Sequence, residues 1–60
     1  MGRIVVIAHK VEGDDPLQEE EDWLNSAEAS LNAEFLHSVY IAGETKGVWY
    51  KYFFRTKGDK

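Results

Sequence analysis

The order of apolar and polar residues along the 60-residue chain predicts three strands and one helix. Residues 4–8 form an unbroken apolar run rich in β-branched side chains, bounded by Arg3 and His9. Such a run is typical of a strand that is covered on both faces. We therefore expect residues 4–8 to be the central strand of a sheet, and residues 11–15, which contain Gly13, to be a loop.

A helix is predicted from Pro16 to about Asn32. Asp15 suits the N-cap, Pro16 suits the first helical position, and Gln18 stands where a capping box places Glu or Gln. Apolar residues then recur at helical spacing on one face. These residues are Leu17, Leu24, Ala27 and Leu31, with Trp23 at the margin of the face.

Two further strands are predicted over residues 35–42 and 48–56, joined by a turn over residues 43–47. Strict alternation would place Phe35, His37, Val39 and Ile41 on one face of the first of these strands, and Leu36, Ser38 and Tyr40 on the other. The two faces of the second are Val48, Tyr50, Tyr52 and Phe54, and Trp49, Lys51, Phe53 and Arg55. Residues 57–60 are expected to form a frayed tail.

These elements predict one small α+β domain with the order strand-helix-strand-strand and an ordered core over about residues 3–56. One helix covers only one face of a three-stranded sheet. The other face carries aromatic residues, so we expect it to be covered by a second copy of the chain or by another partner. The alternative is that Lys51 and Arg55 lie over the apolar side chains and screen them.

Composition excludes several classes of protein. The chain has no cysteine, so it has no disulfide and no thiolate zinc site. No stretch approaches the roughly 18 apolar residues that a membrane span needs, and the N-terminal apolar run is too short for a secretory signal. We therefore expect a cytoplasmic protein without membrane contact. The net charge of −4 argues against nucleic acid as a partner.

Acidic residues are concentrated in the middle of the chain. Ten carboxylates and no Lys or Arg lie between Lys10 and Lys46, and seven of the ten fall within residues 12–22. One interpretation is a solvated face that interacts favourably with the helix dipole. The other is an electrostatic docking surface for a partner protein with a basic surface. The residues expected to supply the attraction are Asp14, Asp15, Glu19, Glu20 and Asp22.

The last predicted strand carries a second candidate site. Residues 46–53 resemble the central motif of RNA-recognition-motif domains, through Lys46, Gly47, Tyr50 and Phe53. Val48, Trp49 and Lys51 depart from that motif, and the chain lacks the second helix-strand unit of the family. In physical terms, Trp49 and Phe53 beside Lys51 and Arg55 would form a stacking platform for single-stranded nucleic acid. Ordinary alternation of core and amphipathic residues explains the same pattern.

Catalysis has no support in the sequence. There is no thiol, no nucleophile elbow, no phosphate-binding glycine loop and no dinucleotide fingerprint, so we expect no enzyme activity and no cofactor. His9 and His37 lack the spacing of metal ligands and are expected to make hydrogen bonds at strand ends and between strands.

The sequence therefore favours a small non-enzymatic protein that binds or regulates another macromolecule. In length, acidity and absence of catalytic motifs it resembles the very small acidic proteins with which bacteriophages block host enzymes, some by imitating nucleic acid. Its basic third strand departs from the purest mimics. Trp49, Phe53 and Trp23 are the expected apolar anchors of the interface. The alternatives are a single-strand nucleic-acid binder and a homodimerising structural domain.

Overall fold

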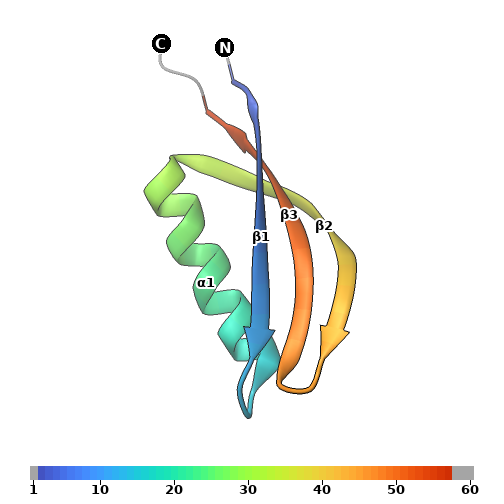
Figure 1. The fold of residues 1–60 in the computed structure, drawn as a ribbon. Helices are drawn as coiled ribbons and strands as arrows, with labels where there is room; N and C mark the ends of the chain where they lie inside the picture. The colour runs from blue at the N-terminus through green and yellow to red at the C-terminus, as the bar shows by residue number, and fades with distance from the viewer. Residues whose placement is uncertain (1, 58–60) are drawn as a thin grey trace.

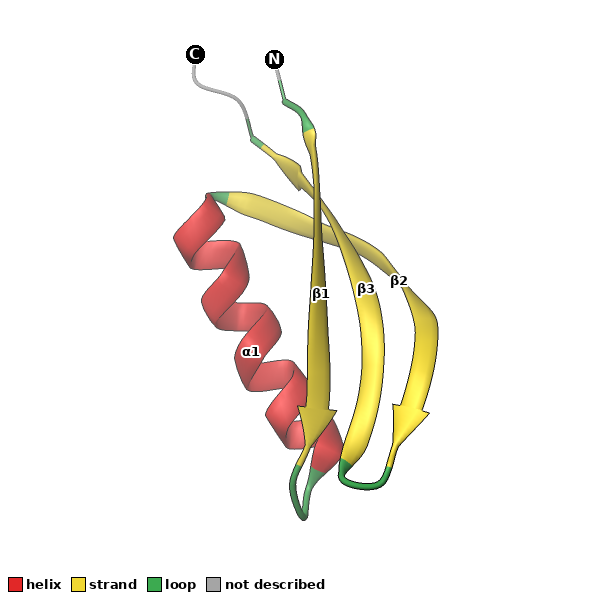
Figure 2. Ribbon diagram, in the orientation of Figure 1, coloured by secondary structure: helices red, strands yellow, loops and turns green. Residues whose placement is uncertain are grey.

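The computed structural model describes residues 2–57 and consists of a three-stranded sheet with one helix on one of its faces (Figures 1 and 2). The elements are β1 (Ile4–Glu12), α1 (Pro16–Leu31), β2 (Ala33–Glu44) and β3 (Gly47–Thr56). The predicted α+β fold with the order strand-helix-strand-strand is confirmed. Every strand is longer than its apolar pattern suggested, because polar residues at the ends, such as Glu12 and Glu44, continue the pairing as far as Gly47.

The prediction that residues 4–8 form the central strand is wrong. The strand order is β1-β3-β2, and both neighbours run antiparallel to β3. β1 and β2 are therefore parallel edge strands, and α1 carries the chain from one to the other (Figure 1). The apolar run of β1 does not need cover on both faces, since Val5 and Ile7 point towards α1 while Ile4 and Val6 remain about half exposed at the edge.

β2 does not alternate strictly. Its register against β3 shifts between Phe35 and His37 and again between Tyr40 and Ala42, which marks two irregularities of the β-bulge kind. The strand bends along its length (Figure 1). Phe35 pairs with Phe54 and joins the core, and the first shift, which follows Phe35, turns His37 to the opposite face, where it pairs with Phe53. The predicted common face for Phe35 and His37 is therefore wrong.

The hairpin between β2 and β3 is tighter than predicted. Glu44 pairs with Gly47, so only Thr45 and Lys46 form the turn. Neither of these two residues has a positive φ, which excludes the primed turns that usually close two-residue hairpins. Glycine is required instead at Gly47, the residue after the turn. A Cβ atom there would lie 2.5 Å from the carbonyl oxygen of Val11 on β1.

The predicted limits of the helix are confirmed. Asp15 is the N-cap, and its Oδ1 accepts a hydrogen bond from the backbone N–H of Gln18 at 3.2 Å. The reciprocal half of the capping box is absent, because the Gln18 amide donates to Asp22 at 2.9 Å instead. Asn32 ends the helix in the left-handed conformation, with φ 52° and ψ 54°.

The core lies between α1 and the sheet, and its two completely buried large side chains are aromatic. Among the described residues, four are buried: Val11, Ala33, Tyr52 and Phe54. Trp23, Leu24, Ala27 and Leu31 of α1 pack against them. Leu17 is 79% exposed, so its predicted place on the buried face is wrong. It precedes Leu24 by two turns and lies outside the aromatic cluster.

The end of β3 is held by the chain that follows α1. The backbone N–H of Lys57 donates to the carbonyl oxygen of Asn32 at 3.0 Å, so the predicted frayed tail does not begin at Lys57. The remainder of that predicted tail, residues 58–60, lies outside the described residues.

Candidate functional site

The sheet face opposite α1 brings together the residues that the last predicted strand offered as a binding platform. Side chains alternate along each strand, so the register places every second residue of the three strands on this side. We call this surface the open face. It consists of Ile4, Val6, Ala8, Lys10 and Glu12 of β1, Trp49, Lys51, Phe53 and Arg55 of β3, and Glu34, His37, Val39, Ala42 and Glu44 of β2. The predicted grouping of Trp49, Lys51, Phe53 and Arg55 on one face agrees with this register.

Ion pairs occupy the two ends of the open face. At one end, Arg55 Nη2 lies 3.2 Å from Glu34 Oε2. At the other, Lys10 Nζ lies 3.0 Å from Glu44 Oε1, and Trp49 Nε1 donates to Glu44 Oε2 at 3.0 Å. The hydrogen bond to Glu44 raises the pKa of Lys10, and the hydrogen bonds from Lys10 and Trp49 lower the pKa of Glu44. Of the four residues of the predicted platform, Arg55 and Trp49 contact these carboxylates. Phe53 stacks on His37.

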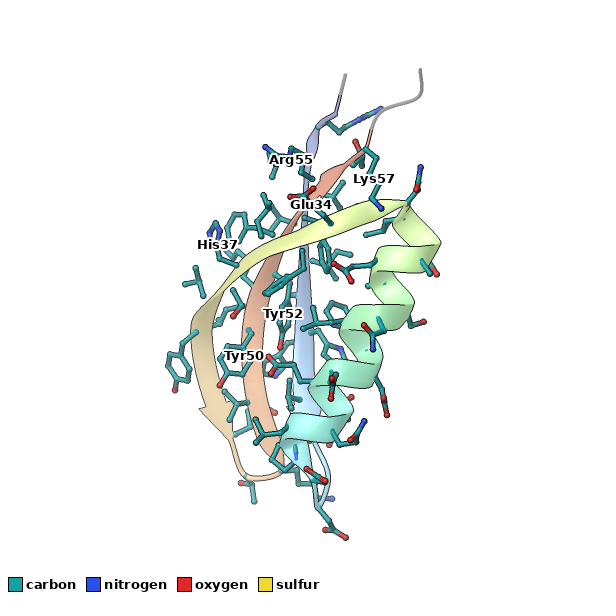
Figure 3. All side chains as sticks on the ribbon, turned by 180° about the vertical axis from the view of Figure 1, so that it is seen from behind. Glu34, His37, Tyr50, Tyr52, Arg55 and Lys57 are labelled. Carbon is teal, nitrogen blue, oxygen red and sulfur yellow. The ribbon has the colours of Figure 1, made fainter. Side chains whose placement is uncertain are left out.

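The middle of the open face is mainly apolar and partly exposed. Val6 is 48% exposed and Val39 47%, and Ile4, beside Arg55 at one end, is 54% exposed. The His37 ring stacks on Phe53, with 4.5 Å between ring centroids and 14° between planes. Figure 3 shows His37 on the side of the sheet away from α1, and Tyr52 on the α1 side. These exposed fractions are evidence against complete screening by Lys51 and Arg55.

The predicted acidic site divides into two groups. Glu19 and Glu20 are half-buried at the inner side of α1, where both accept hydrogen bonds from the sheet. Asp15 caps the helix. The carboxylates that remain exposed to solvent at the beginning and on the outer side of α1 form a surface that we call the acidic helix face. Its members are Asp14, Glu21 and Asp22.

Glu19 and Glu20 connect α1 to two residues of the sheet. His9 Nε2 lies 3.2 Å from Glu19 Oε2, and the His9 ring stacks on Trp23 with centroids 4.1 Å apart and 5° between planes. The Tyr52 hydroxyl donates to Glu20 Oε2 at 2.7 Å. The expected hydrogen bond of His9 therefore exists, but its partner is on the helix. Trp23 packs against His9 and Tyr52, which places this candidate anchor inside the fold.

Tyr52 gives the fold a dependence on alkaline pH. Burial raises the pKa of the Tyr52 phenol, and the hydrogen bond to Glu20 and the charge of Glu20 raise it further. A raised pKa means that the fold favours the neutral phenol. This contribution to the free energy of unfolding is complete below the ordinary phenol pKa of about 10 and is lost as the pH rises above that value.

We expect Tyr52→Phe to make unfolding less sensitive to alkaline pH. At neutral pH the variant should lose about 1.5 kcal/mol of stability, because a hydrogen bond to a charged acceptor is removed. Between neutral pH and about pH 11 its urea midpoint should then fall less than that of the parent chain. Tyr40→Phe is the control, since Tyr40 is 62% exposed. Equal alkaline shifts in the parent and Tyr52→Phe would contradict the assignment.

Two carboxylates with structural roles were missed from sequence. Glu28 of α1 accepts a hydrogen bond from the backbone N–H of Phe35 at 2.8 Å, next to the first register shift of β2. Glu34 pairs with Arg55, 21 residues away in sequence. No local pattern predicts either contact, because both depend on how β2 is placed against α1 and β3.

The described residues contain no group of three or more His, Asp or Glu side chains arranged to hold a metal ion. Within residues 2–57, no helix has the length and apolar character needed to cross a membrane. Comparison of the chain with protein-family models, with curated proteins and with solved structures gave no match.

Proposed function

We propose that this chain is a small non-enzymatic binding protein whose acidic helix face docks on a basic surface of a partner protein. The observation that carries the proposal is the separation of charge in space. Both ion pairs formed by Lys or Arg among residues 2–57 lie on the open face. In the same part of the chain, no carboxylate of α1 pairs with Lys or Arg.

This arrangement is more than helix stability requires. Acidic residues near a helix N-terminus stabilise it by about 0.3–1 kcal/mol each, but only within the first turn. Glu21 and Asp22 lie beyond that turn and are exposed. Asp22 also follows Glu19 by three residues, and like charges at this spacing destabilise a helix by a few tenths of a kcal/mol. These unpaired carboxylates slightly destabilise the helix, but they are well suited to attract a positively charged partner over a distance.

The chemistry suggests a mode of action. Glu21 and Asp22 are adjacent on α1 and Asp14 precedes the helix, so the acidic helix face presents grouped negative charges to a groove that binds phosphates. We propose inhibition or regulation of a nucleic-acid-binding protein by occupation of such a groove, as in the phage-type inhibitors that the composition resembles. Attraction of this kind chiefly raises the association rate.

The test compares two triple variants with the same net charge. Asp14→Asn, Glu21→Gln and Asp22→Asn neutralise the acidic helix face, whereas Glu12→Gln, Glu34→Gln and Glu44→Gln remove the three carboxylates of the open face. Each set removes three negative charges from the chain, whose net charge is −4. Binding to a purified basic nucleic-acid-binding protein is measured by surface plasmon resonance at several salt concentrations, with duplex DNA as a competitor.

We expect the helix variant to associate about tenfold more slowly than the parent at low salt, with little change in its dissociation rate. The open-face variant should keep the parent's rate constants. DNA should compete with the parent chain for the probe. Equal losses in the two variants would show that only bulk charge matters, and binding that does not weaken with salt would overturn the proposal.

The nucleic-acid alternative receives less support from the geometry. Its platform does lie on one face, but Glu34 neutralises Arg55 and Glu44 holds both Lys10 and the indole N–H of Trp49. Among the cations of the open face, Lys51 is left to contact a phosphate. Quenching of tryptophan fluorescence by a single-stranded oligonucleotide at low salt would favour this alternative.

A further inference from the structure

We infer that the open face binds the open face of a second copy of this chain, forming a symmetric sandwich of two sheets with the helices outside. The first argument is the size of the core. Only Tyr52 and Phe54 are large side chains that the fold buries completely among the described residues. The chain has no cysteine, and its described residues contain no group of side chains that could hold a metal ion, so association is the means we infer for supplementing so small a core.

Charge selects the second copy as the occupant. The chain carries a net charge of −4, so two copies repel each other over most orientations. The open face is the exception, because its three cations are balanced by three carboxylates: Lys10, Lys51 and Arg55, and Glu12, Glu34 and Glu44. A basic partner would gain little from this neutral surface and much from the acidic helix face. A second copy meets the least repulsion here, and neutrality on both sides is the complementarity that a two-fold interface requires.

The apolar residues occupy the part of the face that a sandwich would bury. Val6 pairs with Phe53, and Phe53 with His37, so these three cross the sheet between the Arg55–Glu34 pair and the Lys10–Glu44 pair. Ala8, Lys51 and Val39 form the adjacent row. This is the usual anatomy of an interface, an apolar centre with a polar rim. Two sheets would pack about 10 Å apart, with the stem of Lys51 lying over apolar side chains.

Pairing of edge strands is the competing mode of self-association. The register shifts of β2 interrupt its outer edge, whereas β1 pairs with β3 without a shift over its whole length. Edge pairing through β1 would leave Phe53 and Val39 exposed, because it uses backbone groups of one strand only. It therefore does not remove the apolar surface that argues for association, and we favour the sandwich.

The test is the molar mass in solution of three proteins, measured by sedimentation equilibrium from micromolar to millimolar concentration. The parent should reach the mass of two chains, and it should do so equally at low salt and at about 1 M salt, where the Debye length is about 3 Å. Val6→Glu places a charge in the centre of the open face and should remain a monomer. Leu17→Glu makes the same change of charge at a residue that is 79% exposed on α1, and should still form the dimer.

Far-ultraviolet circular dichroism checks that Val6→Glu is folded, and Val39→Glu provides an independent variant on β2 if it is not. Intermolecular nuclear Overhauser effects in a mixture of labelled and unlabelled chains should involve the Phe53 and Val39 side chains. A parent that stays monomeric, a dimer that survives both substitutions, or intermolecular effects confined to the β1 backbone would each overturn the inference.

The dimer and the proposed docking of the acidic helix face differ in their dependence on salt. The dimer should resist salt, while docking of the acidic helix face on a basic protein should weaken with it. Monomeric Val6→Glu should still bind the basic probe, because α1 lies on the opposite side of the sheet (Figure 2). A parent chain that stays monomeric but binds the probe would overturn only the sandwich. A parent chain that dimerises but does not bind the probe would overturn only the proposed function.

Discussion

Phe54→Ala is expected to be the most damaging of the single changes considered. Phe54 is 0% exposed and contacts the rings of Trp23 and Phe35, at centroid distances of 6.0 Å and 5.8 Å. Removal of a buried Phe side chain costs about 3–5 kcal/mol. A chain of this length has roughly 3–9 kcal/mol of stability in total, at about 0.05–0.15 kcal/mol per residue. The substitution therefore removes between about a third and all of the stability.

Phe53→Ala is the matched control, because it removes the same side chain one residue earlier in β3. Phe53 is only half-buried and lies on the open face, stacked on His37. Its loss should cost about 1 kcal/mol in an isolated chain. Urea unfolding followed by tryptophan fluorescence at the lowest practical concentration compares the two variants with little contribution from self-association. Similar losses would mean that β3 does not separate a core face from an open face.

Gly47→Ala is expected to be the second most damaging of the single changes considered. The new Cβ would lie 2.5 Å from the carbonyl oxygen of Val11 and 2.9 Å from Cβ of Glu12. Both atoms belong to β1 where it pairs with the first residues of β3. Because one of the two is a backbone atom, the clash is relieved only by moving the strands apart. The cost should be about 1–3 kcal/mol, the usual range for overpacking.

Gly43→Ala is its control in the same hairpin. A Cβ at Gly43 would have only the Tyr40 hydroxyl within 4 Å, at 3.4 Å, which is an ordinary contact. Gly43→Ala should be neutral or stabilise the fold by about 0.4–1 kcal/mol through the unfolded state. Thermal unfolding by circular dichroism measures both changes. A neutral Gly47→Ala would show that β1 and β3 are not packed this closely at the turn.

The candidate surfaces were only partly predictable. The grouping of Trp49, Lys51, Phe53 and Arg55 followed from alternation along a single strand, and the structure retains it. The run of acidic residues was evident from the sequence. Its separation into carboxylates that contact the sheet and carboxylates that remain exposed was not. Glu19 and Glu20 face the sheet because His9 and Tyr52 are there to donate hydrogen bonds. Those partners come from β1 and β3, 10 and 32 residues away in sequence.

The position and limits of the helix could be predicted from residues near its ends. Asp15, Pro16 and Asn32 act on the backbone within a few positions of themselves, so their effects can be read without any knowledge of the fold. The type and approximate place of each strand were equally local, since they follow from the period of apolar side chains. The α+β order of elements was therefore available from the amino-acid sequence.

Strand order, the bulges of β2 and the destination of individual side chains required the folded chain. An apolar run such as residues 4–8 reports that a strand is buried on at least one side, but not whether it has one neighbour or two. β3 is central because the tight hairpin pairs one of its edges with β2, while its other edge pairs with β1. His37 reached the open face through a register shift that no periodic pattern contains. Contacts between distant segments depend on the packing of the whole molecule, and a linear pattern holds no information on which of several compatible pairings buries the most surface.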